Sequence, residues 1–136
     1  MLDCLVVEDV GRVVNPLTLH GQAIGGMVQG LGGAFLEHRV YDANGQLLAG
    51  NLTDYLIPTA TDFPKIRAIA LENHRSPSNP LGVKGAGEGA IISIGGLMAN
   101  AVANVVWFGA MPNQLPLTSA RVWHMGSSKQ SAGSSE

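Results

Sequence analysis

"LHGQAIGGMVQGLGGAFL", residues 19–36, is the stretch that decides the fold. Its apolar side chains recur at spacings of three and four, as they do along one face of an α-helix; they are Ile24, Met27, Val28, Leu31 and Phe35. The same segment contains glycines at positions 21, 25, 26, 30, 32 and 33. Each glycine costs about 1 kcal/mol relative to alanine in a helix interior. We therefore predict a helix whose bare side packs closely against another backbone or a large flat ligand.

Segments rich in β-branched residues predict short strands on both sides of this helix. "CLVVEDV", residues 4–10, precedes the helix, and a second strand is predicted at residues 66–72. Residues 37–50 are predicted to form a β-hairpin with Asn44-Gly45 as its turn. The order of helices and strands indicates an α+β fold.

A second long helix is predicted at residues 91–108, within a longer run without charged side chains. That run, residues 89–111, is long enough to span a bilayer. Ser93, Asn100 and Asn104 argue against a spanning helix, because the two asparagines lie four residues apart and so share one face. A buried amphipathic helix explains the pattern better, and we expect no membrane contact.

The composition is that of one modest domain. The chain has 136 residues, of which 46% are apolar and 13% charged, and its net charge of -2 offers no basic face for nucleic acid. Residues 1–125 are predicted to form one domain, with residues 111–123 as an extended exit and 126–136 as a flexible tail. Cys4 is a single cysteine and the start lacks the pattern of a signal peptide, so we expect a cytoplasmic location.

The second informative stretch is "PLGVKGAGEGA", residues 80–90. It fits the loose dinucleotide pattern G-x-G-x-x-A, but no acidic residue follows at the distance that a ribose contact requires. A P-loop is excluded because Lys84 precedes the glycines and no Ser or Thr follows it directly. The four histidines stand singly, without the spacing of metal ligands.

Glu88, the acid in this stretch, has two interpretations. A carboxylate at a helix N-terminus stabilises the helix dipole by about 0.3–1 kcal/mol. Alternatively, a carboxylate beside apolar surface can act as a general base. The glycines at 85, 87 and 89 leave backbone N–H groups approachable, which suits an anionic or polar cofactor. The residues alone leave both interpretations open.

Several motifs in order carry a family resemblance. They are "EDVGRVVNPLTLHGQAIGGMVQGLGGAFLE", "DYLIPTATDFP", "NPLGVKGAGEGA", "ANAVANVV" and "LPLTSARVW". From about Asp3 to Trp123 the chain resembles the C-terminal part of the molybdenum-binding subunit of the xanthine dehydrogenase / aldehyde oxidase / carbon monoxide dehydrogenase family. The resemblance implies two long glycine-rich or apolar helices packed on a small, mostly antiparallel sheet.

The resemblance also implies a function and its residues. Family members are molybdenum hydroxylases that oxidise an N-heterocycle, an aldehyde or CO at a molybdopterin-type cofactor. The glutamate of the "KGAGE" motif, which deprotonates the Mo–OH group, maps onto Glu88. The glutamine of the "GQ" pair, which lies at the pterin, maps onto Gln22. The remaining implied cofactor-binding residues are Lys84, Gly85, Ala86 and Gly87, whereas Gln29 is interpreted as a packing residue.

Family subunits are much longer, which implies partners. The rest of the molybdenum subunit would complete the pterin pocket and the substrate funnel, and iron–sulfur clusters and FAD would reside on partner chains. The isolated chain is then expected to be inactive and to self-associate through apolar side chains such as Ile24, Val28, Met98 and Val105. The alternative is a non-catalytic fragment, or an assembly or binding module, that keeps the fold without bound cofactor.

Overall fold

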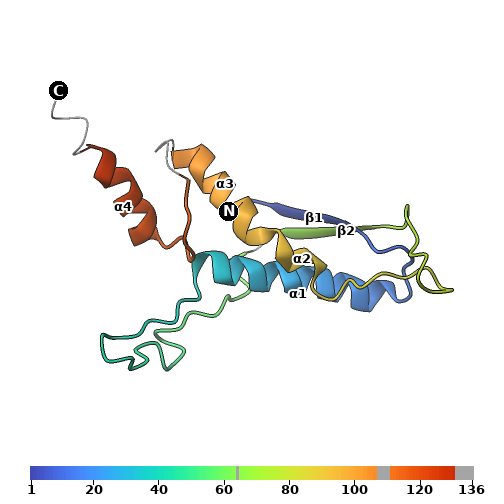
Figure 1. The fold of residues 1–136 in the computed structure, drawn as a ribbon, viewed down its shortest axis with the longest axis horizontal. Helices are drawn as coiled ribbons and strands as arrows, with labels where there is room; N and C mark the ends of the chain where they lie inside the picture. The colour runs from blue at the N-terminus through green and yellow to red at the C-terminus, as the bar shows by residue number, and fades with distance from the viewer. Residues whose placement is uncertain (64, 107–110, 131–136) are drawn as a thin grey trace. The chain divides into compact units, whose positions relative to one another are not determined.

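The computed structural model describes residues 1–63, 65–106 and 111–130 (Figure 1). The elements are β1 (Cys4–Asp9), α1 (Pro16–Phe35), β2 (Ile66–Leu71), α2 (Gly89–Ile92), α3 (Ile94–Val106) and α4 (Ser119–Gln130). The chain divides into a first unit, Met1–Gly30 with Pro58–Ile94, and a second unit, Leu31–Ile57 with Gly95–Glu136. Both helices and strands are present, so the α+β prediction is confirmed.

The sheet of the first unit corrects one prediction. β1 and β2 pair in parallel, in a register that runs from Cys4 opposite Ile66 to Asp9 opposite Leu71. The prediction of a mostly antiparallel sheet was therefore wrong. The connection between the two strands contains α1, and a crossover of this length with a helix is how parallel neighbours are joined.

α1 begins three residues earlier than predicted because of a cap that precedes the apolar pattern. The Asn15 side-chain oxygen accepts hydrogen bonds from the backbone N–H of Leu17 at 3.0 Å and of Thr18 at 3.2 Å. Pro16 follows at the first helical position, where its fixed φ suits a helix start. The buried face of α1 consists of Ala23, Met27, Leu31 and Ala34, at the predicted helical spacing.

Gly26 confirms the predicted close packing of α1 against another backbone, whereas Gly30 packs against a side chain. A Cβ on Gly26 would lie 3.4 Å from the Cβ of Ala90, and a Cβ on Gly30 would lie 2.8 Å from the Cβ of Ile94. Gly21 and Gly25, by contrast, have nothing within 4 Å of the corresponding position in the described chain. The glycines at 26 and 30 thus let the segment around α2 approach α1.

We expect Gly30→Ala to destabilise the protein by up to about 2 kcal/mol. The added methyl group must displace Ile94, which costs about 1–3 kcal/mol, and the better helix propensity of alanine offsets about 1 kcal/mol of this. Gly25→Ala is the matched control, because its added methyl meets open space and only the propensity gain remains. Urea unfolding of both variants measures the difference. Equal stabilisation by the two substitutions would contradict the packing described here.

The predicted second long helix is divided. Residues 89–106 form α2 and α3 with a turn at Ser93 between them, while 107 and 108 lie outside the described residues. Ile94 and Met98 are buried, and Asn100 and Asn104 are exposed, as expected for an amphipathic helix.

The same segment retains the composition of a membrane span. By length and composition alone, Gly89–Val106 could cross a membrane, with a mean hydropathy of 1.7, a test that core helices of soluble proteins also pass. The structure buries 17% of this window.

Two of the side chains predicted to mediate self-association differ in exposure. Val105 is 80% exposed, whereas Met98 is 8% exposed and cannot serve in a self-association surface. Self-association itself stays a prediction.

In the second unit, the predicted hairpin is reduced to one bridge. Tyr41 and Leu47 form an isolated antiparallel bridge around a turn in which Gly45 has φ +81°. The Asp42 side chain holds this turn by accepting hydrogen bonds from the backbone N–H groups of Asn44 and Gln46. The turn is therefore where it was predicted, without strands of regular length beside it.

α4 occupies a region that was predicted to be extended or flexible. Thr118 caps its start, since its hydroxyl oxygen accepts a hydrogen bond from the backbone N–H of Arg121 at 3.3 Å. The helix continues to Gln130, so residues 126–130 of the predicted tail are helical, and 131–136 lie outside the described residues.

Candidate functional site

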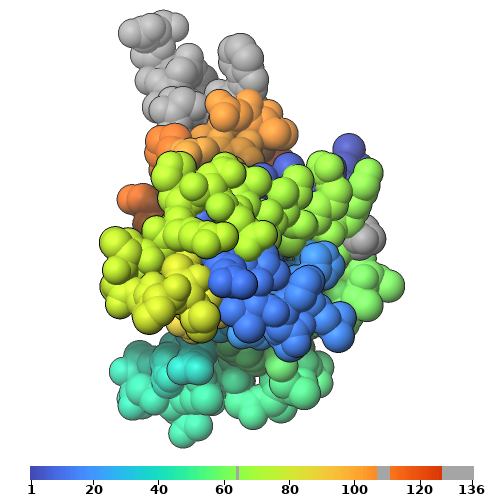
Figure 2. Space-filling model, turned by 90° about the vertical axis from the view of Figure 1, so that its right-hand side faces the viewer, coloured from blue at the N-terminus to red at the C-terminus, as the bar shows by residue number. Residues whose placement is uncertain are grey.

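A pocket of about 260 Å³ lies in the first unit, between the start of α1 and the loop of residues 80–88. Figure 2 shows the yellow-green surface of this loop region against the blue surface that leads into α1. The lining residues are Val10, Arg12, Val13, Val14, Asn15, Thr18, Leu19, Gln22, Val83, Lys84, Ala86 and Gly87. The walls are mainly aliphatic, with a few polar groups, as is common in ligand sites.

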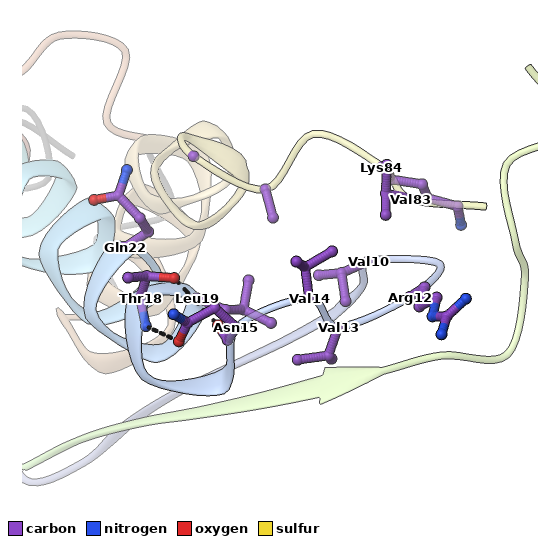
Figure 3. A pocket seen from close by; sticks show the side chains of 12 residues that line it. Val10, Arg12, Val13, Val14, Asn15, Thr18, Leu19, Gln22, Val83 and Lys84 are labelled. Atoms are coloured by element: carbon purple, nitrogen blue, oxygen red, sulfur yellow. Dashed lines mark hydrogen bonds between the residues drawn. The ribbon is translucent and has the colours of Figure 1, made fainter. Parts of the chain in front are cut away.

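The pocket brings together four of the six residues that the sequence singled out. Gln22, Lys84, Ala86 and Gly87 all line it. In Figure 3, Gln22 projects from α1 toward the loop, and its side-chain nitrogen would lie 3.6 Å from a Cβ on Gly87. Within the described residues, the Gln22 amide has no hydrogen-bond partner, so both its donor and its acceptor are available.

Gly85 and Glu88 lie on the same loop without lining the pocket. A Cβ on Gly85 would meet nothing within 4 Å, so the backbone there is open to approach. Glu88 is exposed and stands at the N-cap of α2, but its side chain makes no capping hydrogen bond. The described residues offer its carboxylate no ion-pair partner either, which leaves both oxygens free.

A different carboxylate lies on the inner side of the α2 start. A Cβ atom on Gly89 would clash with the Glu8 carboxylate, which is the group nearest to that position. One of the two Glu8 oxygens is buried and has no hydrogen-bond partner in the described chain. A side chain at position 89 would therefore require the Glu8 carboxylate to move.

Asp9 was not predicted, although it makes more contacts than any of the predicted site residues. Its side-chain oxygens accept hydrogen bonds from the backbone N–H groups of Gly11 and His74, both at 2.9 Å, and from Lys84 Nζ at 3.1 Å. The His74 ring nitrogen Nδ1 lies 3.3 Å away. The Gly11 N–H, followed by Lys84 and His74, holds the pKa of Asp9 well below its usual range, while burial opposes this shift.

The backbone around Asp9 also requires glycine at two positions. Gly11 has φ +72° and Gly82 has φ +70°, a region that disfavours other residues. A Cβ on Gly11 would clash with the Gly82 carbonyl oxygen, and the Lys84 N–H donates to the Val10 carbonyl at 3.0 Å. The turn after β1 and the loop before Glu88 therefore touch backbone to backbone.

Metal ligands do not gather anywhere in the described ranges, where no group of three or more His, Cys, Asp or Glu residues could hold an ion. The polar groups of the pocket instead suit an organic cofactor held by an amide and by backbone N–H groups.

Comparisons with known proteins identify the family to which the chain is related. A profile described as "Molybdopterin cofactor-binding domain" matches residues 1–64. The chain is 40% identical over 115 residues to the 6-hydroxypseudooxynicotine dehydrogenase complex subunit gamma of Paenarthrobacter nicotinovorans, which covers 85% of this chain and 14% of that subunit. It is 38% identical over 120 residues to the xanthine dehydrogenase molybdenum-binding subunit of Escherichia coli O157:H7, covering 88% of this chain and 16% of that subunit.

A solved structure shares the fold as well. The crystal structure of quinoline 2-oxidoreductase from Pseudomonas putida 86 matches with a TM-score of 0.83 and 37% identity, over 90% of this chain and 16% of that chain. The chain thus spans 14–16% of the length of these relatives. It belongs to the xanthine dehydrogenase / aldehyde oxidoreductase / CO dehydrogenase family and corresponds to the molybdopterin cofactor-binding segment of that family's large subunits.

Proposed function

We propose that this chain contributes the base and part of the pterin pocket to a molybdenum hydroxylase. The observation that carries the proposal is the convergence of the free Gln22 amide and the glycine loop on one pocket, with the free carboxylate of Glu88 at the end of that loop. The three relatives described above are named for pseudooxynicotine, xanthine and quinoline, all of which contain nitrogen heterocycles. We therefore favour an N-heterocycle over an aldehyde or CO as the substrate.

The residues fit a molybdopterin-type cofactor. A flat, polar pterin needs hydrogen-bond partners at its edge and a backbone that it can approach, and Gln22 and the open side of Gly85 provide these. Gln22 would hold the pterin, while the N–H groups of residues 85–87 would face its more polar parts and Lys84, paired with Asp9, would hold the start of the loop. When bound, the cofactor supplies the two-electron oxidation of the substrate.

In this proposal Glu88 is the general base. Its carboxylate would accept a proton from the hydroxyl group that the bound cofactor supplies, which would make that oxygen a stronger nucleophile toward an electron-poor carbon of the substrate. The loop glycines keep side chains away from the space in which the two reactants must meet.

The proposed assembly includes more chains. The rest of a large subunit would close the pocket over Gln22 and the loop, and iron–sulfur and flavin proteins would carry electrons away. The name of one relative describes it as a subunit of a dehydrogenase complex. Without these partners, we propose that the chain is inactive and that its exposed apolar surface leads to self-association.

The test is the molybdenum and pterin content of the complex that co-purifies with this chain from its native host. We expect molybdenum and pterin in equal amounts, stoichiometric with the chain, and loss of both on removal of the partner chains. A stable complex that contains neither would contradict the proposal and would favour the alternative of a non-catalytic binding module.

A further inference from the structure

Asp9 connects the end of β1 and its following turn with two segments that are distant in sequence. It lies at the end of β1 and contacts Gly11 in the following turn, His74 after β2, and Lys84 in the loop that leads to Glu88. The side chain of Asp9 is 21% exposed and that of Lys84 is 34% exposed. Their ion pair is therefore partly shielded from water, and salt screens it less than a pair on the open surface.

The loop between Lys84 and α2 has few other supports. Residues 85–87 take part in no backbone or side-chain hydrogen bond within the described chain. Lys84 is held twice, through its backbone N–H to the Val10 carbonyl and through Nζ to Asp9. At the other end, α2 is held where Ala90 meets Gly26. The position of Glu88 is thus set by one anchor on each side.

We infer that Asp9 is a positioning residue, which holds Lys84 and thereby fixes the loop that presents Glu88 and residues 85–87 to the pocket. This inference rests on the proposed function of Glu88. Asp9 itself contacts neither the pocket interior nor Glu88, so it acts through Lys84. His74 contributes mainly its backbone N–H, because its side chain is 84% exposed.

The inference separates two roles for Lys84. If its ammonium group bound the cofactor directly, loss of Lys84 would lower molybdenum content, whereas loss of Asp9 would leave that content intact. If the ion pair positions the loop, both losses act on the same step. A double-mutant cycle distinguishes these cases, because residues that act as one unit give non-additive effects.

The experiment uses the assembled holoenzyme with Asp9→Asn, Lys84→Met and the double variant. Asparagine can keep Oδ1, which accepts from Gly11 and Lys84, but it removes the charge that holds Lys84, and its NH2 group replaces the Oδ2 that accepts from the His74 N–H. We expect kcat to fall by about 10- to 100-fold, as for a small misplacement of a catalytic group, with KM and molybdenum content unchanged. The double variant should be no slower than either single variant. Amide hydrogen exchange of residues 84–88 should become faster in all three.

Asp3→Asn is the matched control. Asp3 also forms an ion pair, with Arg67 at 2.6 Å, but it precedes β1, at the opposite end of that strand from Asp9. We expect this variant to keep both kcat and the exchange rates of residues 84–88. Parallel changes in Asp3→Asn would indicate a general loss of stability and would overturn the assignment of Asp9.

Two other outcomes overturn the inference. One is an unchanged kcat and unchanged loop exchange in Asp9→Asn. The other is loss of molybdenum in Lys84→Met alone, which would make Lys84 a direct cofactor ligand. Failure of the proposed function is recognised separately, because Glu88→Gln would then keep normal turnover while Asp9→Asn still accelerated exchange of the loop.

Discussion

Glu88→Gln is expected to lower turnover of the assembled enzyme by about 10²–10⁴-fold, the range typical of a lost general base. Glutamine preserves the shape of the side chain but cannot accept a proton. Because the carboxylate makes no capping hydrogen bond, its removal should not disturb the start of α2. Steady-state kinetics together with metal analysis checks this result, and molybdenum content should stay at the wild-type level.

Glu88→Asp is the control for this substitution. It keeps the carboxylate but shortens the side chain by one methylene, so turnover should lie between those of the wild type and Glu88→Gln. Near-normal turnover in Glu88→Gln would remove Glu88 from catalysis. Its position at the N-cap of α2 would then be explained by the weaker interaction with the helix dipole.

Gln22→Ala is expected to weaken cofactor binding by about 1–3 kcal/mol, the cost of leaving polar groups of the pterin without partners. The enzyme should then contain substoichiometric molybdenum, and the molecules that retain it should turn over at the normal rate. Metal analysis and activity per bound molybdenum measure the two effects separately.

Gln29→Ala provides the matched comparison. Gln29 is the same residue type on the same helix and is exposed, but it does not line the pocket. Its removal should leave molybdenum content unchanged. If Gln22→Ala also keeps full occupancy and activity, Gln22 is a polar residue near the start of α1 and no more.

Local patterns in the sequence predicted the elements that depend on local spacing. The apolar periodicity placed α1, and the β-branched runs placed β1 and β2. The direction of strand pairing was missed because it depends on how a long connection returns to the sheet, which no short pattern encodes. α4 was missed because its segment has little apolar periodicity, although Thr118 carried the signal of a cap.

In the candidate site, too, local motifs were predicted from the sequence and contacts between distant residues were not. Gln22 and the loop of residues 84–87 were predicted from a family motif, and the structure brings Gln22, Lys84, Ala86 and Gly87 to one pocket. The roles of these residues remain predictions. Asp9 could have been noticed as an Asp two residues before a glycine, a pattern typical of a turn. Its ion pair with Lys84 joins residues far apart in the sequence, so no local signal could identify that partner.

The first unit is assembled from two separate stretches of chain, and this has a consequence for how sequence length can vary. Residues 31–57 leave the unit and return before β2 completes the sheet. Lengthening this connecting segment lowers the free energy of unfolding only a little, since each doubling of the length of a flexible loop costs about 0.6 kcal/mol. The Asn44-Gly45 turn is therefore a natural place to insert a tag or reporter, while the pocket around Gln22 keeps all of its own contacts.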